Sequence, residues 1–188
     1  MRYMTFGTRT GLRVSQYALG TANFGTRWAK GADPAECRRM LEAFAEAGGT
    51  FLDTADIYQY GESESLLGQF LAGDRDHFAV ASKFTHGSGP DAGLMETGNS
   101  RKTLVLALEA TLRRLGTDYL DLYWAHWPDF VTPAEEIVAT FDDLVRQYER
   151  LDRVSAPILG ILHEGANNIL NSIFGGRLGQ FDRLSAAS

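Results

Sequence analysis

Short apolar runs and stretches of helically spaced apolar residues alternate along the chain and predict a regular succession of strands and helices. Residues 5–15 alternate in polarity around Thr10 and Gly11, which predicts a short hairpin. The predicted strands that follow are 17–21, 50–55, 78–84 and 119–126. The predicted helices run from Pro34 to a stop at Gly48, over 62–71, from a cap at Asn99 or Ser100 to Leu115, and from a cap at Thr132 with Pro133 to about Asp152. Four strand-then-helix units in succession favour a parallel α/β fold.

The C-terminal part of the chain has a different pattern. Residues 148–188 contain no fifth strand of comparable strength. Tyr148 and Leu151 continue the apolar stripe of the preceding helix, which must end before Pro157. A short helix is predicted at 166–174. The sequence therefore divides into βα units over 1–147 and a tail over 148–188.

Length, charge and cysteine content exclude several classes of protein. The chain of 188 residues is too short for an eight-unit barrel of about 250 residues. Its 18 basic and 24 acidic residues argue against nucleic-acid or lipid-surface binding. No apolar run is long enough to span a membrane, and the first residues do not resemble a signal peptide.

A single cysteine, Cys37, is expected in the core. It excludes an internal disulfide framework and fits a cytoplasmic location. His77, His86 and His163 have no partners at metal-ligand spacing, so no metal site is predicted.

Polar residues stand where the predicted parallel strands end, which is the edge at which such folds bind ligands. They are Gly20 and Thr21 after the first strand, Asp53 and then Tyr58 after the second, Lys83 on the third and His126 on the fourth. Each residue taken singly has an ordinary structural explanation, such as capping backbone groups or packing in a core. Their occurrence on neighbouring strands and at one edge favours a common chemical role.

The side chains in this set are suited to proton delivery. A tyrosine has a pKa of about 10, so it acts as an acid near neutral pH more readily when a lysine ammonium stabilises its phenolate. An aspartate next to that lysine keeps it charged, and a histidine can hydrogen-bond a substrate oxygen. No side chain donates hydride, so reduction of a carbonyl group at this site implies a nicotinamide or flavin cofactor.

Four segments of the sequence closely resemble the aldo-keto reductases, which are NADPH-dependent oxidoreductases with a TIM-barrel fold. They are GLRVSQYALGTANFG, FLDTADIYQYGESESLLGQFL, VASKF and SRKTLVLALEATLRRLGTDYLDLYWAHWPD. The resemblance covers residues 1 to about 147. It implies that Tyr58 is the general acid, that Lys83 and Asp53 tune its pKa, and that His126 orients the substrate.

The same resemblance implies further site residues and a cofactor. Gly20, Thr21 and Asp53 are expected near the nicotinamide and its ribose, and the cofactor is expected to be NADPH, with NADH left open. Trp28 and Trp127 are expected to line the pocket for a small carbonyl substrate, although both also fit a role as packed aromatic residues.

The resemblance also implies an incomplete barrel. Gln147 is followed by YERLDRVSAPILGILHEG, which resembles the extreme C-terminal segment of the family. About four βα units are therefore expected, with an N-terminal hairpin and a C-terminal tail, and about 130 to 150 residues of a usual barrel have no counterpart. Residues 1–147 are expected to form the N-terminal half of the barrel and 148–188 a tail of the same fold.

The sequence is compatible with three hypotheses about function. The first is a reductase that converts an aldehyde or ketone to an alcohol with Tyr58 as proton donor. The second is an inactive, shortened relative that acts as an interaction or regulatory module. The third is a deletion form of a full-length reductase. In any of them, open strand edges favour a homo-oligomer that covers them.

Overall fold

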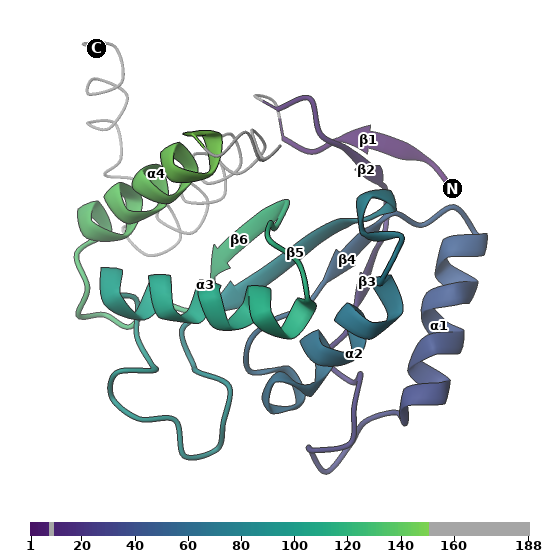
Figure 1. Ribbon diagram of the computed structural model, residues 1–188, viewed down its shortest axis with the longest axis horizontal. Helices are drawn as coiled ribbons and strands as arrows, with labels where there is room; N and C mark the ends of the chain where they lie inside the picture. Colours follow the sequence, from purple (N-terminus) through teal and green to yellow (C-terminus); the bar gives the residue numbers. More distant parts are fainter. Residues whose placement is uncertain (8–9, 151–188) are drawn as a thin grey trace.

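The structure is a computed structural model that describes residues 1–7 and 10–150. Its elements follow the predicted order (Figure 1). They are β1 (Tyr3–Thr5), β2 (Arg13–Ser15), β3 (Ala18–Gly20), α1 (Pro34–Glu46), β4 (Phe51–Asp53), the 3-10 turn η1 (Tyr58–Gly61), α2 (Glu62–Leu71), the 3-10 turn η2 (Arg75–His77), β5 (Ala79–Phe84), α3 (Arg101–Leu115), β6 (Leu122–Ala125) and α4 (Ala134–Arg150). The predictions for the tail beyond residue 150 lie outside the described residues.

Four strands form one parallel sheet in the order β3-β4-β5-β6, and β1 and β2 form a separate antiparallel hairpin. The predicted parallel α/β fold with an N-terminal hairpin is confirmed. Right-handed βα units of this kind place successive helices on one side of the sheet. Figure 1 shows α1, α2 and α3 on the same face, and α4 beside β6.

The main core fills the space between the sheet and these helices. Leu52 and Val80 of the sheet are fully buried against Leu41, Leu67 and Leu104 of the helices. A smaller cluster lies on the other face of the sheet, where Phe6 and Leu12 of the hairpin region pack with the members from the strands, Phe51, Ala81, Leu122 and Trp124. Cys37 is a buried free thiol in the main core, as expected.

Helix caps explain most of the helix boundaries. The Asp33 side chain accepts a hydrogen bond from the N–H of Glu36, and Pro34 is the first residue of α1. Of the two predicted caps of α3, the structure has Ser100, which accepts from the N–H of Thr103. The cap predicted at Thr132 is wrong, because its hydroxyl donates to the Asp129 carboxylate instead, and α4 begins at Ala134.

The last predicted strand is shorter than expected, because a side chain replaces part of the ladder. β6 begins at Leu122, whereas the pattern predicts a start at 119. The carboxylate of Asp121 accepts the N–H of Val80 and pairs with Arg75, which also donates to the carbonyl of Tyr119. These contacts hold 119–121 beside the sheet without regular strand pairing.

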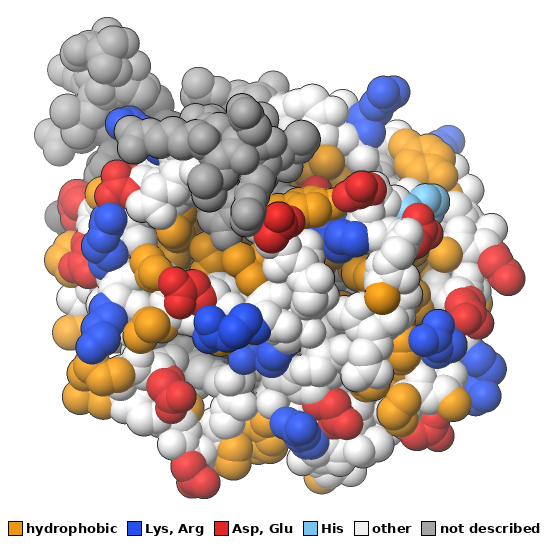
Figure 2. Space-filling view, in the orientation of Figure 1, with side chains coloured by type: hydrophobic (Ala, Val, Ile, Leu, Met, Phe, Trp, Pro, Cys, Tyr) orange, Lys and Arg blue, Asp and Glu red, His pale blue; other side chains and the backbone are white. Residues whose placement is uncertain are grey.

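The face that carries the helices has mixed charge. Figure 2 shows acidic and basic side chains interspersed over this face. Among the described residues, no helix has both the length and the apolar composition needed to cross a membrane.

Candidate active site

The strand register brings the predicted site residues to one edge of the sheet. Gly20 is level with Asp53 on the neighbouring strand, and Lys83 is level with Trp124 two positions before His126. The N–H of His126 donates to the carbonyl of Phe84, which fixes the first residue after β6 beside the end of β5. The C-terminal ends of β3 to β6 therefore present their polar side chains in one region, as the parallel fold predicts.

Lys83 is at the centre of this group. Its Nζ lies 2.7 Å from Asp53 Oδ2, 2.8 Å from the carbonyl oxygen of Thr54 and 3.2 Å from the phenol oxygen of Tyr58. An ammonium group has three protons and no acceptor, so these three contacts use all of its donors. In the third contact the phenol oxygen must therefore accept, which leaves the phenol proton of Tyr58 free to be donated elsewhere.

The ion pair between Lys83 and Asp53 is only partly exposed. The side chain of Lys83 is 15% exposed and that of Asp53 is 31% exposed. The ammonium donates to a carboxylate and a carbonyl, and it lies 4.8 Å from the centre of the Tyr58 ring. A positive charge is thus held beside the phenol, where it stabilises a phenolate more than a neutral phenol.

His126 also contacts Tyr58. The two rings meet edge to face with their centres 5.8 Å apart. Burial, together with smaller effects of the nearby Lys83 and His86, lowers the pKa of His126 to about 4. The imidazole is therefore neutral at pH 7 and carries one N–H that can donate to a substrate oxygen.

Aromatic rings extend the site on both sides. Trp28 contacts Tyr58 and Tyr60 edge to face, each at 6.2 Å between ring centres. Trp127 stacks on His126 and is 57% exposed. The structure brings both tryptophans next to predicted site residues, and their role as a substrate wall stays a prediction.

His86 and Tyr60 were not predicted from the sequence as site residues. The His86 ring contacts both His126, at 5.8 Å, and Trp127, at 6.3 Å, and is exposed. It comes from the loop after β5, three residues beyond Lys83, and that position is the signal that could have indicated it.

Gly20 and Thr21 take different places. Thr21 is fully buried, and its hydroxyl donates to the carbonyl oxygen of Asp53 and accepts from Ser63. Its N–H also donates to the carbonyl of Asp53, so Thr21 holds the backbone that carries the carboxylate. At Gly20 an added Cβ would have no heavy atom within 4 Å, so this strand end is open.

The open strand end and the partly exposed carboxylate fit the nicotinamide end of a dinucleotide. A flat ring can approach the backbone at Gly20, because no side chain stands there. Asp53 has one carboxylate oxygen on Lys83, and its side chain is 31% exposed, so a ribose hydroxyl can reach it. Among the described residues, no group of three or more histidine, cysteine or acidic side chains could hold a metal ion.

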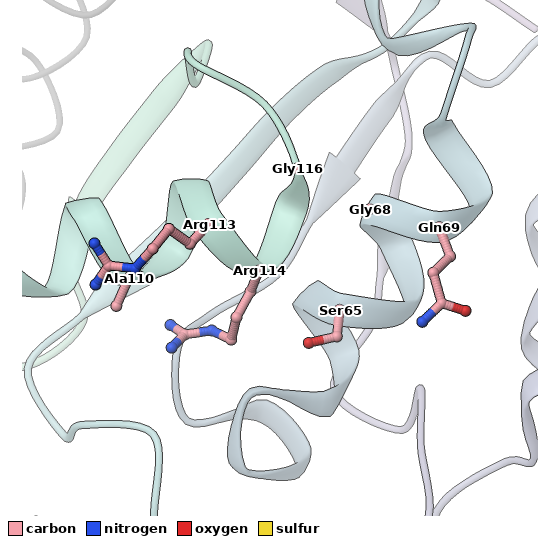
Figure 3. Close-up of a pocket in the computed structure, with 7 residues that line it drawn as sticks. All are labelled: Ser65, Gly68, Gln69, Ala110, Arg113, Arg114 and Gly116. Carbon is pink, nitrogen blue, oxygen red and sulfur yellow. The ribbon is translucent and has the colours of Figure 1, made fainter.

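A separate groove of about 670 Å³ lies between α2 and α3, outside this site (Figure 3). It is lined by Ser65, Gly68, Gln69, Ala110, Arg113, Arg114 and Gly116. Arg114 is not free to bind a ligand there, because its guanidinium contacts Glu64, Ser88 and Thr111. None of the predicted site residues lines this groove.

Comparison with known proteins places the chain in a family. The sequence profile of the Aldo/keto reductase family matches residues 17–147. The chain belongs to the Aldo/keto reductase family, which confirms the resemblance and implies that the parallel sheet is part of a TIM barrel. The boundary predicted at residue 148 stays a prediction.

The relatives are mostly much longer than the matched segment. Norsolorinic acid reductase from Aspergillus flavus is 40% identical over 145 residues, which are 72% of this chain and 37% of the relative. Aldo-keto reductase ausK from Emericella nidulans is 31% identical over 78% of this chain and 39% of its own length. AAD6 of Saccharomyces cerevisiae, named as a candidate aryl-alcohol dehydrogenase, is 33% identical, and the match covers 74% of it. The chain is thus short against most of these proteins, as expected.

Proposed function

We propose that this site delivers the proton in an NADPH-dependent reduction of an aldehyde or ketone to an alcohol. The observation that carries the proposal is the contact of 3.2 Å between Lys83 Nζ and the phenol oxygen of Tyr58. Because the ammonium donates in this contact, the phenol proton is directed away from Lys83 and is available to a substrate. Tyr58 is therefore the proposed proton donor.

The roles of the other residues follow from their positions. The N–H of neutral His126 donates to the carbonyl oxygen and orients it beside Tyr58. NADPH, when bound, supplies a hydride to the carbonyl carbon and is oxidised to NADP⁺. Tyr58 gives its phenol proton to the oxygen as negative charge develops there, and Lys83 stabilises the phenolate that remains. Asp53 keeps Lys83 in place throughout.

Cofactor and substrate are proposed on separate grounds. Gly20 and Asp53 are the proposed contacts to nicotinamide and ribose, and Thr21 supports Asp53 from behind. NADH remains the alternative cofactor. Trp28 and Trp127 form the proposed substrate wall, and an aromatic wall favours an aryl aldehyde or ketone. The name of AAD6, which refers to an aryl alcohol, supports this substrate class.

A second candidate is an interaction module formed by paired copies of the chain. Within the described residues, β3 pairs only with β4 and β6 only with β5, so each has one unpaired edge. Such edges add strands readily. Light scattering on the purified chain separates a dimer from a monomer. The free thiol of Cys37 supports a cytoplasmic location for either function.

The test of the reductase compares Tyr58→Phe with the unsubstituted chain. The variant keeps the ring contacts but has no phenol proton, so turnover of benzaldehyde should fall by about 100-fold or more. NADPH loss measured by absorbance reports turnover, and quenching of NADPH fluorescence reports binding, which should stay within about twofold. Tyr17→Phe, at a 65% exposed tyrosine, is the control and should leave both unchanged.

Two outcomes contradict the proposal. Equal turnover in Tyr58→Phe and the unsubstituted chain would exclude Tyr58 as the proton donor. No NADPH oxidation by the unsubstituted chain, at any tested concentration, would exclude the reductase function for this chain.

A further inference from the structure

The backbone just after Tyr58 has an unusual conformation. Gln59 and Tyr60 have φ values of 50° and 54°, in the left-handed region, and Gly61 follows with φ 81°. A left-handed conformation costs a residue with a side chain about 1–2 kcal/mol, whereas glycine adopts it freely. Glycine would therefore form this turn with less strain than glutamine does, so the turn alone does not explain why Gln59 is there.

The side chain of Gln59 makes three hydrogen bonds to one loop. Its Nε2 donates to the carbonyls of Ala22 and Lys30, both at 3.0 Å, and its Oε1 accepts the N–H of Trp28 at 2.7 Å. The side chain is fully buried, so water cannot reach its amide, and these three hydrogen bonds satisfy its polar atoms instead. One amide thus holds the loop that follows β3 at three points.

That loop carries Trp28, one wall of the proposed substrate site. The Trp28 ring contacts Tyr58, the residue immediately before Gln59. Glu62 supports the same loop from the start of α2, because its carboxylate accepts the N–H groups of Thr26 and Arg27. The position of the wall is therefore set by residues adjacent in sequence to the proton donor.

We propose that Gln59 is a positioning residue that fixes Trp28 against Tyr58. The strained turn aims the amide at the loop, and the three hydrogen bonds tie the wall to the segment that carries the phenol. Wall and proton donor then keep a constant separation. That Trp28 is a substrate wall rests on the function proposed above, whereas the attachment of Trp28 to Gln59 does not.

Amide exchange of Trp28 tests the attachment without any activity. The full chain labelled with ¹⁵N-tryptophan has three tryptophan backbone signals, from Trp28, Trp124 and Trp127, and Trp28→Phe assigns the first. Gln59→Gly removes the three hydrogen bonds and relieves the strain, so the fold should hold. The Trp28 amide should then exchange at least about tenfold faster, while the amide of Trp124 in β6 stays protected.

Two further variants complete the experiment. Gln59→Met keeps the side-chain length without the amide and should accelerate Trp28 exchange as Gln59→Gly does. Gln69→Met makes the same change at an exposed site on α2 and should leave Trp28 exchange unchanged. If Gln59→Met unfolds, the Trp124 amide also loses its protection, which reveals the unfolding. The Trp28 exchange rate in Gln59→Gly then decides the test. Unchanged protection of Trp28 in Gln59→Gly would overturn the proposal.

Kinetics test the consequence for substrate. In Gln59→Gly the KM for benzaldehyde should rise about fivefold or more, while kcat and NADPH affinity change by less than about twofold. A loosened Trp28 with an unchanged KM would overturn the role in substrate positioning. If the unsubstituted chain shows no turnover, the reductase proposal fails, and the exchange experiment still decides whether Gln59 holds Trp28.

Discussion

Replacement of Asp56 by asparagine should make the stability of the protein less sensitive to a rise in pH. Asp56 is 2% exposed, and neither of its carboxylate oxygens has a hydrogen bond within the described residues. Burial and, to a smaller extent, the negative charge of Glu64 raise the pKa of this carboxyl from 3.8 to about 7. The backbone N–H groups of Ile57 and Gly87 lie near the carboxylate without forming a regular hydrogen bond to it, and together with the charge of Arg114 they offset only part of the rise.

The raised pKa of Asp56 sets the size of its effect on the free energy of unfolding. A folded-state pKa about three units above 3.8 corresponds to about 4 kcal/mol at 1.36 kcal/mol per unit. The folded protein binds more protons than the unfolded chain between about pH 4 and pH 7, so stability falls as the pH rises through this window. Between pH 5 and pH 8 the predicted loss from Asp56 is about 2.5 kcal/mol. Asparagine has no charge to bury, so Asp56→Asn should escape this loss.

Urea unfolding at pH 5 and pH 8 measures this pH-dependent loss of stability. The stability of Asp56→Asn relative to the unsubstituted chain should increase by about 2.5 kcal/mol from the lower to the higher pH. Asp91→Asn, at an exposed loop carboxylate, is the control, and its difference should not change with pH, because that carboxylate remains in water. The same difference for Asp56→Asn at both pH values would refute the reasoning.

Two predictions concern the contact between α2 and α3. Arg114→Met should lower the free energy of unfolding by about 3–5 kcal/mol, because it leaves the fully buried Glu64 without its cation, whereas Arg113→Met, at a 71% exposed side chain, should cost less than about 1 kcal/mol. Equal losses of unfolding free energy for Arg114→Met and Arg113→Met, measured by urea unfolding, would contradict this prediction. Gly68→Ala should cost about 1–3 kcal/mol, because its Cβ would lie 2.7 Å from backbone atoms of the last turn of α3; Gly89→Ala, with open space, should be neutral. A neutral Gly68→Ala would show that the helices separate at little cost.

Much of the site was predictable because the fold depends on local patterns. Apolar periodicity and capping residues such as Asp33 indicate successive βα units, and such units place the carboxyl ends of their strands together. Asp53 and Lys83 could therefore be assigned to one edge before any distance was known, and the structure places them 2.7 Å apart.

Other features depend on contacts between distant segments and left no local signal. Gln59 is a polar residue in a polar loop, and its bonds to residues 22–30 exist only after the loop has folded over it. The burial of Asp56 likewise comes from packing around the sheet and helices rather than from its neighbours in sequence. The shorter β6 results from the side chain of Asp121, which the strand pattern does not reveal.

The three acceptors around Lys83 explain why this position holds a lysine rather than an arginine. Arginine occurs 15 times in the sequence and lysine only three times, yet the residue at the centre of the site is a lysine. An ammonium directs three protons along diverging tetrahedral directions toward Asp53, Thr54 and Tyr58, whereas a guanidinium directs its donors within one plane. The pocket is therefore shaped for a compact tetrahedral cation, and arginine is a poor substitute at this position even though its charge is the same.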